Sequence, residues 1–438
     1  MFDGCWDAKV LADRACQSAA SRRPTGGSGK RLAASVRKRP AVAKAAPPAK
    51  RKKRERRPAA GYPPAAPMPG ASRHGLVAGP KTFDKYTKGA TWPCGPAGPV
   101  IRLGSDCSGL DSPKVALDLM GLGSRVECCF CSDKERACQV FLKAAHAPKI
   151  LYENADKAGS AEAPEVDVYT AGFPCQPWSS EGKSKGFKDA DGRGRVFDHV
   201  AKYIKEREPK SFLLENVRAL TFKNHAGAFA KMLVTLRVSG RYFITWRLIN
   251  CRDFGIPQNR HRVYIVGLRR DAVAASAGAG FPWPMKKRGV APLPLRRFLC
   301  GGPGVLKTKP PVGSRAALQL HIATKTIIKE RSGDPSTQPW VVECLSGREP
   351  PQCLLGIVPC ITRRRAAAGG HWVTQLGRFL TVEEMLNLQG LPVPFREKAR
   401  QRGLTDVQIA QMAGNAIPTN VLMLLLARVL TKLGLEGR

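Results

Sequence analysis

Acidic residues are scarce in this sequence. Asp and Glu number 34 against 72 Lys and Arg, which leaves a formal net charge of +38. A chain with so few negative charges of its own indicates a polyanionic partner. Nucleic acid is the first candidate for that partner, ahead of an anionic membrane.

Long apolar runs are missing as well. No uninterrupted stretch of about 18 apolar residues occurs, so we expect no membrane span. The first residues, Met1–Asp7, carry two acids and no apolar segment, so we expect no secretory signal peptide. The 438 residues are 43% hydrophobic, which is enough to bury a sizeable core in two or three domains.

Regular cysteine spacing is the third absence. The chain has 14 cysteines, but no Cys-x-x-Cys-x-x-Cys cluster, so the sequence predicts no metal site. The irregular spacing favours free thiols in a reducing compartment over a disulfide framework. Four of the cysteines crowd together, at Cys128, Cys129, Cys131 and Cys138.

The N-terminal segment 1–95 is predicted to be a disordered basic tail. Between Ser21 and Ala60, 15 Lys and Arg stand against one acid, and Pro, Ala and Gly fill most of the rest. The run Lys50–Arg57 is typical of a nuclear import signal, which predicts nuclear localisation. The alternatives are an arm that lies on phosphates, a solvated linker, or an organellar transit peptide; the acids Asp3 and Asp7 count against the last.

Strands and helices alternate from residue 100 onward. A strand at 100–104 enters a tight turn and a helix at 113–120, for which Ser112 is the expected N-cap. A second strand, 126–131, ends near Asp133 and is followed by a helix at 135–146. This order is typical of a nucleotide-type cofactor site at the carboxyl ends of parallel strands. The predicted fold class is therefore α/β, a Rossmann-like domain with a mostly parallel sheet.

An unusual cysteine follows the next predicted strand. The strand at 166–169 leads through Gly172 to Cys175, which lies between Pro174 and Pro177. The two prolines stiffen the turn, so the thiol is presented at a defined point. Taken alone, Cys175 is either a positioned nucleophile or an inert thiol in a proline-rich turn.

Charged residues follow the later strands. Glu215 ends a strand at 211–214, where a carboxylate points into a ligand crevice or serves as an N-cap or surface acid. A helix at 226–238 and strands at 243–250 and 263–268 come next. Arg260 and Arg262 are two residues apart, so both face one side if the chain is extended there. They could hold a phosphate or a base edge, or line a solvated surface.

The regular pattern breaks between residues 269 and 372, where Pro, Gly and basic residues are frequent. This stretch indicates a smaller basic domain or a large insertion. The pattern returns with a helix at 381–388, for which Thr381 and Glu384 form a capping signal. A very apolar helix at 421–430 follows.

Five ordered motifs together resemble the S-adenosylmethionine-dependent cytosine-C5 DNA methyltransferases. They are Gly-Phe-Pro-Cys-Gln-Pro at 172–177, Glu-Asn-Val at 215–217, Gln-x-Arg-x-Arg at 258–262, Arg-Phe-Leu-Thr-x-x-Glu with Leu-Gln-Gly-Leu-Pro at 378–392, and Gly-Asn-Ala-Ile-Pro at 414–418. The resemblance covers about residues 100–430. It implies a catalytic domain in two parts, 96–270 and 373–438, which flank a target-recognition domain at 271–372.

The resemblance also implies roles for individual residues. Cys175 is the expected nucleophile toward carbon 6 of cytosine, and Glu215 the acid that stabilises the ring during addition. Arg262 is expected to hold the cytosine carbonyl and Arg260 to support the loop or backbone. The remaining expected contacts are to S-adenosylmethionine for Asp106, Cys107, Ser108, Gly109, Asp133, Asp156 and Asn415, and to a flipped cytosine of duplex DNA for Pro174, Gln176, Ser179, Asn216 and Gln258.

The cofactor turn departs from the family's pattern. In place of a Phe-x-Gly-x-Gly-Gly type turn, this chain has Cys107 at the aromatic position and Asp111 and Ser112 at two glycine positions. This departure keeps open a catalytically silent DNA-binding homologue. A second alternative is the tRNA-methylating branch of the same fold, although its short signature is missing from the recognition region.

Overall fold

The computed structural model describes residues 80–86, 97–155, 163–174, 195–275, 278, 280–300, 309–391 and 394–436. The chain divides into the units Met1–Pro63 and Pro64–Arg438, and all described residues belong to the second. Residues 80–86 fold although they lie in the segment 1–95 that the sequence predicts to be disordered. Their helix α2 (Pro80–Phe83) and the following turn bury Phe83 and Tyr86. These two aromatic side chains supply an apolar anchor that offsets the cost of ordering the segment.

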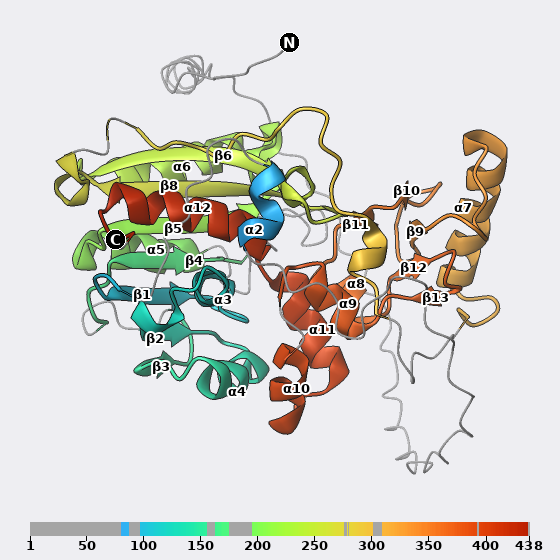
Figure 1. The fold of residues 1–438 in the computed structure, drawn as a ribbon, viewed down its shortest axis with the longest axis horizontal. Coiled ribbons are helices and arrows are strands. Elements are labelled where there is room, and N and C mark those ends of the chain that lie inside the picture. The colour runs from blue at the N-terminus through green and yellow to red at the C-terminus, as the bar shows by residue number, and fades with distance from the viewer. Residues whose placement is uncertain are drawn as a thin grey trace, which may run out of the picture. The chain divides into compact units, whose positions relative to one another are not determined.

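A seven-stranded sheet forms the core of the second unit, in the order β3-β2-β1-β4-β5-β8-β6 (Figure 1). The first five of these strands are parallel, and β8 is antiparallel to both β5 and β6. The prediction of a mostly parallel α/β sheet is thus confirmed. The strands are β1 (Ile101–Asp106), β2 (Val126–Ser132), β3 (Ile150–Tyr152), β4 (Val168–Ala171), β5 (Ser211–Val217), β6 (Tyr242–Asn250) and β8 (His261–Arg269).

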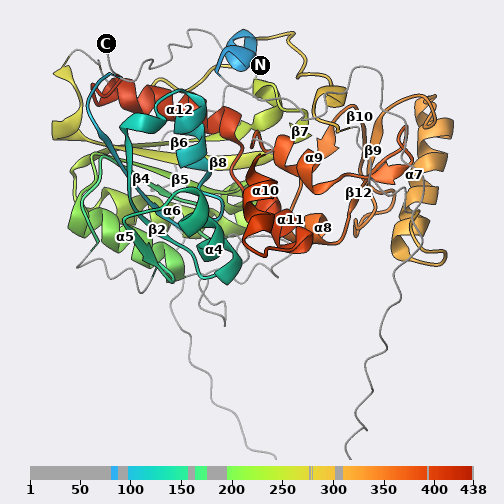
Figure 2. The same cartoon turned by 60° about the horizontal axis from the view of Figure 1, so that its bottom comes forward.

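Helices cover both faces of the sheet (Figures 1 and 2). Alternate strand residues enter opposite cores: Val168 packs on one face, with α3 (Ser112–Leu119) and α12 (Thr419–Lys432). Its neighbour Tyr169 packs on the other, with α5 (Val196–Arg207) and α6 (Ala226–Arg237). Burial on both faces explains why the strands are nearly continuous apolar runs.

Two helix starts test the capping signals in the sequence. Thr381 caps α9 (Val382–Asn387) and forms a capping box with Glu384, as predicted. At α3 the predicted N-cap is wrong: Asp111 precedes the helix in a left-handed conformation (φ 47°), and Ser112 is already helical. The turn after β1 needs a residue at positive φ there, and Asp tolerates that region better than most residues.

A second, four-stranded sheet has the order β10-β9-β12-β13. Its own small core includes Ile327 of α7 (Arg315–Arg331), Trp340 and Trp372. Residues Leu293, Leu295 and Phe298 instead pack into the main core, although they lie within the predicted target-recognition segment 271–372. The boundaries of that segment stay predictions. The strands of the second sheet are β9 (Trp340–Glu343), β10 (Cys353–Leu355), β12 (His371–Val373) and β13 (Arg378–Phe379).

Short elements connect the two sheets. A parallel pair joins β7 (Gln258–Asn259) to β11 (Val358–Pro359). Helix α8 (Arg363–Ala367) lies beside α11 (Asp406–Asn415) in both views (Figures 1 and 2). The approach is so close that a Cβ at Gly414 would lie 2.5 Å from the backbone nitrogen of Arg363. Glycine is therefore required at position 414.

Two peripheral helices complete the described chain. Helix α4 (Arg136–Ala145) follows β2, and α10 (Pro394–Gln401) packs on it, with the rings of Phe141 and Phe395 centred 5.4 Å apart. Through this contact α10 braces α4, the helix that begins three residues after Asp133. The bracing matters because that element borders the cleft described below.

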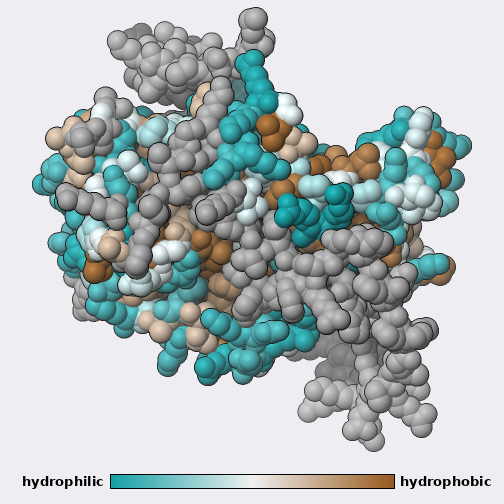
Figure 3. Space-filling model, in the orientation of Figure 1, coloured by the Kyte–Doolittle hydropathy of each residue, from teal (hydrophilic) through white to brown (hydrophobic). Residues whose placement is uncertain are grey.

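Apolar side chains remain exposed on the part of the chain that carries α7 and β10 (Figure 3). Leu318 and Ile328 of α7 and Leu355 of β10 are among the exposed large hydrophobic residues. No single helix of the described ranges is long and apolar enough to cross a membrane; α11 and α12 reach that length only as a pair bent by 47°.

Candidate active site

A cleft of about 1530 Å³ opens at the carboxyl ends of β1, β2, β4 and β5. Parallel strands deliver their ends to one edge of a sheet, so residues far apart in sequence meet there. Gly109 and Asp133 line one end of the cleft, and Pro174, Glu215 and Arg262 line it further along. The cleft therefore unites the residues expected to bind the cofactor with those expected to act on the base.

The turn after β1 is held by Asp133. The backbone N–H of Gly109 donates to Asp133 Oδ2 at 2.9 Å, and the N–H of Glu135 donates to Oδ1 at 2.9 Å. Ser108 adds a second tie, because its backbone N–H donates to the Ser132 carbonyl at 2.9 Å. Burial raises the pKa of Asp133.

Gly109 faces open space in this cleft. Its φ is +58°, and a Cβ placed on it would meet no atom within 4 Å. Cys107, two residues earlier, also has a positive φ of 52° and lines the cleft. An open cradle beside a strand-end acid suits a ligand whose ribose hydroxyls bind the carboxylate, as S-adenosylmethionine would require.

Asp106 is committed to the interior of the sheet. Its Oδ1 accepts a hydrogen bond from the Ser132 hydroxyl, and its Oδ2 accepts one from the Tyr169 hydroxyl at 2.6 Å. Burial raises the pKa of this carboxyl. Both carboxylate oxygens of Asp106 already accept a hydrogen bond from the protein. A contact with the cofactor, as predicted, would have to use the second lone pair of one of these oxygens.

Glu215 and Arg262 form the charged centre at the other end. Arg262 Nε lies 2.9 Å from Glu215 Oε1, an ion pair that falls short of an aligned hydrogen bond. Burial raises the pKa of Glu215, although Arg262 and Arg260 act in the opposite direction. A carboxyl group with a raised pKa keeps its proton to higher pH and can donate it to a ring nitrogen.

Asn216 supports the loop that leads to Cys175. Its Nδ2 donates to the Phe173 carbonyl at 3.1 Å, and its Oδ1 accepts from the backbone N–H of Val217 at 2.8 Å. Asn216 was predicted to contact the base, but both of these hydrogen bonds join it to the backbone. They tie β5 to the residues just before Pro174.

Arg260 and Gln258 are structural links. The guanidinium of Arg260 donates to the carbonyls of Ile361 at 2.6 Å and Ala416 at 2.8 Å, and Arg260 is 2% exposed. Gln258 Nε2 donates to the Leu388 carbonyl, and its Oε1 accepts from the N–H of Ile361. The predicted supporting role of Arg260 agrees with these bonds, whereas Gln258 is fully buried and is not among the cleft-lining residues.

Two residues that line the cleft, Cys360 and Arg363, were not among the predicted site residues. Cys360 lies 3.6 Å from Arg260 Nη1 and 3.7 Å from Arg262 Nη2 through its sulfur. Burial alone would raise the pKa of this thiol, but the two arginines lower it below its ordinary value. Nothing in the sequence around Cys360 signals this position.

Arg363 is the second unpredicted contribution. It forms a bidentate ion pair with Glu135, at 3.0 and 3.1 Å, and so links α8 to the start of α4. The basic run 363–365 is visible in the sequence, but its pairing with Glu135 is not. Asn415, predicted for the cofactor, is exposed and lines the cleft.

Four predicted site residues lie outside the described ranges. They include the expected nucleophile and two of its neighbours, so the structure gives no distance to it. Pro174, the last described residue before it, lines the cleft together with Glu215. The four are Asp156, Cys175, Gln176 and Ser179.

Comparison with solved structures agrees with this architecture. The methyltransferase EhMeth of Entamoeba histolytica matches 76% of this chain and 98% of its own, with a TM-score of 0.51 and 15% identity. The Dnmt2 methyltransferase of S. pombe matches 75% of this chain and 98% of its own, with a TM-score of 0.51 and 14% identity. At such low identity the likeness concerns the fold.

Sequence comparison goes further. Residues 102–292 match the family model described as C-5 cytosine-specific DNA methylase. The Type II methyltransferase M.NgoBI of Neisseria gonorrhoeae is 31% identical over 263 residues, which cover 60% of this chain and 73% of that protein. M.HaeII of Haemophilus aegyptius is 29% identical over 281 residues, 64% of this chain and 78% of that protein. The chain therefore belongs to the C-5 cytosine-specific DNA methylase family and is a DNA cytosine-5 methyltransferase.

Proposed function

We propose that this protein transfers a methyl group from S-adenosylmethionine to carbon 5 of a flipped-out cytosine, through a covalent bond between Cys175 and carbon 6. The observation that carries the proposal is the continuous cleft, which joins Gly109 and Asp133 at one end to Pro174, Glu215 and Arg262 at the other. S-adenosylmethionine bound at the first end and a cytosine bound at the second would share one cavity. Proximity of this kind is the first requirement of group transfer.

The covalent step answers a chemical difficulty. Carbon 5 of cytosine is a weak nucleophile, and addition of the Cys175 thiolate at carbon 6 places electron density on carbon 5. S-adenosylmethionine supplies the electrophilic methyl group when it is bound. After transfer, a base removes the proton from carbon 5, and the electron pair of that bond re-forms the ring double bond as the thiolate leaves.

Glu215 assists the addition by proton sharing. As the thiolate adds to carbon 6, negative charge builds on the ring at N3, and a protonated carboxyl beside it neutralises that charge. The raised pKa of Glu215, caused first by burial, favours the protonated form. Arg262, whose Nε lies 2.9 Å from Glu215 Oε1, would keep Glu215 in place and bind the carbonyl of the base.

Base flipping follows from the geometry of the substrate. Carbon 6 of a stacked cytosine is not reachable inside a duplex, so the base must leave the stack to enter the cleft. Exposed cationic side chains, among them Arg364 of α8 and Arg348, line the cleft. They are available to bind the phosphates of the duplex. Phosphate contacts of this kind position the duplex and make binding salt-dependent.

The test is a covalent trap. Duplex DNA that carries 5-fluorocytosine cannot lose a proton from carbon 5, so the enzyme remains attached after methyl transfer. We expect an adduct in the presence of S-adenosylmethionine with the full chain and none with Cys175→Ser. Cys360→Ser is the matched control, because it removes another cysteine of the same cleft and should still form the adduct.

The alternatives predict other outcomes of the same trap. Methylation of tRNA, with no adduct on DNA, would identify tRNA as the substrate in place of DNA. DNA binding without any detectable binding of S-adenosylmethionine would identify a silent homologue. An adduct that survives Cys175→Ser would remove Cys175 from the mechanism.

We also propose that the basic run Lys50–Arg57 directs the protein to the nucleus. The run contains seven Lys and Arg and one Glu. A fluorescent fusion of the full chain in eukaryotic cells should be nuclear and should lose that distribution when the seven basic residues become Ala. Mitochondrial or plastid fluorescence would favour the transit-peptide alternative.

A further inference from the structure

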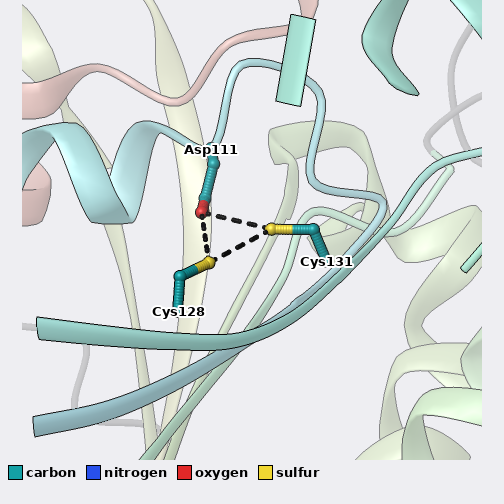
Figure 4. A group of neighbouring side chains, drawn as sticks. All are labelled: Asp111, Cys128 and Cys131. Carbon is teal, nitrogen blue, oxygen red and sulfur yellow. Dashed lines mark hydrogen bonds between the residues drawn. The ribbon is translucent and has the colours of Figure 1, made fainter. Parts of the chain in front are cut away.

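Asp111, Cys128 and Cys131 form a buried triangle beside the cofactor turn (Figure 4). The sulfur atoms of Cys128 and Cys131 are 3.5 Å apart. Asp111 Oδ2 lies 4.0 Å from the sulfur of Cys128 and 3.6 Å from that of Cys131. All three residues are buried, and none has a role in the reaction proposed above.

A bulge in β2 brings the two thiols together. Residues three apart in a regular strand point to opposite faces of the sheet. Here the pairing with β1 passes from Leu103–Cys128 directly to Gly104–Phe130, so Cys129 is the extra residue. The bulge returns Cys131 to the face of Cys128, and Asp111 at the start of α3 points at both (Figure 4).

The three distances match one face of a tetrahedral zinc site. Zinc binds thiolate sulfur at about 2.3 Å and carboxylate oxygen at about 2.0–2.2 Å. In a tetrahedron these bonds place two sulfurs about 3.8 Å apart and a sulfur and an oxygen about 3.5 Å apart. The observed separations of 3.5, 3.6 and 4.0 Å lie within about half an ångström of those values. We propose that Asp111, Cys128 and Cys131 bind a structural Zn²⁺ ion.

The electrostatic environment of Asp111 supports a cation. Its Oδ1 is buried without a hydrogen-bond partner among the described residues, and the described ion pairs do not include Asp111. A carboxylate buried in this way is costly unless a positive charge or donors compensate it. A divalent ion would compensate it, and thiolates are preferred zinc ligands.

A hydroxyl group lies beside one of the two thiols. Ser105 Oγ lies 3.5 Å from the sulfur of Cys131, on the neighbouring strand β1. Either this hydroxyl or a water completes four-coordination in a site with three protein ligands.

The ion would brace the cofactor turn. Asp111 is two residues after Gly109, whose N–H is bonded to Asp133, and Cys128 and Cys131 belong to β2, the strand that ends at that acid. A metal ion bound by Asp111, Cys128 and Cys131 would fasten the cofactor turn to β2. Asp111 stands where the family's turn has its second glycine. The role is positioning of the turn, and it is independent of the methyl-transfer mechanism.

The test measures metal rather than activity. The full chain, produced with zinc and purified without chelator, should contain one zinc per chain by elemental mass spectrometry. Cys131→Ala and Asp111→Gly should each lose it; glycine at 111 keeps the positive φ of the turn and removes only the ligand. Cys344→Ala, which removes a buried free cysteine from the small core beside the second sheet, should keep the zinc.

A second measurement does not depend on the folding of variants. Wild-type protein stripped of zinc and reconstituted with Co²⁺ should show thiolate-to-cobalt charge-transfer absorption. Absence of both zinc and this absorption would overturn the proposal, as would zinc retained in Asp111→Gly and Cys131→Ala. A Cys128–Cys131 disulfide in the native protein, found by peptide mass spectrometry, would also overturn it.

Discussion

Glu215 is held between two opposing influences. Burial disfavours its charged form, whereas Arg262 and Arg260 favour it, and burial is the stronger, so the pKa is raised. Such competition is typical of groups that must exchange protons near neutral pH. Burial also raises the pKa of Asp133, but there the opposing influence comes from two backbone N–H groups, and the residue holds a turn.

The pH dependence of turnover should report the proton on Glu215. Its protonated form is lost as pH rises through the raised pKa, so kcat should fall on the alkaline side. We expect this alkaline limb in the pH profile of the full chain and its loss in Glu215→Gln. The variant's kcat should fall by about 10²–10⁴-fold.

Single-turnover methylation with labelled donor, measured across pH, separates chemistry from product release. DNA affinity of Glu215→Gln should change far less than its rate. An unchanged alkaline limb in the variant, or an equal loss of binding and rate, would contradict the catalytic role of Glu215.

Cys360 should be unusually reactive for a partly buried thiol. Arg262 and Arg260 lower its pKa, so its thiolate persists to lower pH than that of an ordinary cysteine. Pulse alkylation with iodoacetamide, read by peptide mass spectrometry, should modify Cys360 with a midpoint below the usual value. Cys251, whose pKa burial raises to about 12, serves as the internal control and should react only at high pH.

Removing the charge of Arg262 tests whether it lowers the pKa of Cys360. Arg262→Gln should move the alkylation midpoint of Cys360 upward and leave that of Cys251 nearly unchanged. A midpoint for Cys360 at or above the ordinary value in the unmodified chain would show that burial dominates.

At the scale of elements, backbone carbonyls and buried side chains join segments distant in sequence. Arg260 connects the start of β8 to the chain after β11 and to the end of α11. At α9, Glu384 accepts from Arg378 at 2.6 and 2.8 Å and also from the Cys300 N–H. Both partners of this pair are buried, at 7% and 0% side-chain exposure.

Breaking the buried pair at α9 should be severely destabilising. Glu384→Gln leaves the Arg378 charge buried without its carboxylate and weakens the capping box at Thr381. We expect the free energy of unfolding to fall by about 3–5 kcal/mol. Urea denaturation followed by circular dichroism measures the loss.

Lys202→Ala is the matched control for an exposed pair. Lys202 and Glu206 lie 3.9 Å apart on the surface of α5. Its effect should be at most about 1 kcal/mol. A comparable loss in both variants would mean that the α9 pair contributes no more than a surface contact.

At the scale of the whole molecule, the positive charge is only partly available to a partner. Arg363 and Arg365 of the basic run in α8 are paired internally, with Glu135 and Glu343. Lys286 lies 3.6 Å from Asp253. The N-terminal tail, in contrast, has 15 basic residues against one acid between Ser21 and Ala60. That stretch therefore carries +14 of the net charge of +38, and the remaining +24 lies on the rest of the chain.

The salt dependence of DNA binding should expose the contribution of the tail. Replacing the seven basic residues of Lys50–Arg57 by Ala should weaken binding and flatten the plot of log K against log salt concentration. The slope should become shallower by about 0.9 for each phosphate that the tail no longer neutralises. The methylation rate at saturating DNA should stay the same, because the cleft is unchanged.

Exchanging Lys for Arg and Arg for Lys in the same run is the control, since it keeps the charge. That variant should retain the slope of the unmodified chain in fluorescence anisotropy titrations. An identical slope for the Ala variant would place the tail away from the phosphates.

The sequence alone was sufficient for six of the seven strands of the large sheet, all except β3, and for the acids near the strand ends. Asp133 follows β2 and Glu215 lies near the carboxyl end of β5, and parallel strands carry their carboxyl ends to one edge, so the meeting of the two acids in one cleft is a consequence of local pattern. The capping box at Thr381 is equally local. Motif order was enough to indicate the family, because its residues recur at fixed places in the chain.

Only the tertiary structure decided what the side chains of Gln258, Arg260 and Arg363 do. Their partners lie about a hundred or more residues away, at Ile361, Ala416 and Glu135, and no local pattern encodes such a pairing. The meeting of Asp111, Cys128 and Cys131 likewise depends on a bulge set by pairing with β1. Local periodicity determines which residues a strand buries, whereas a register shift or a distant carbonyl determines what they meet there.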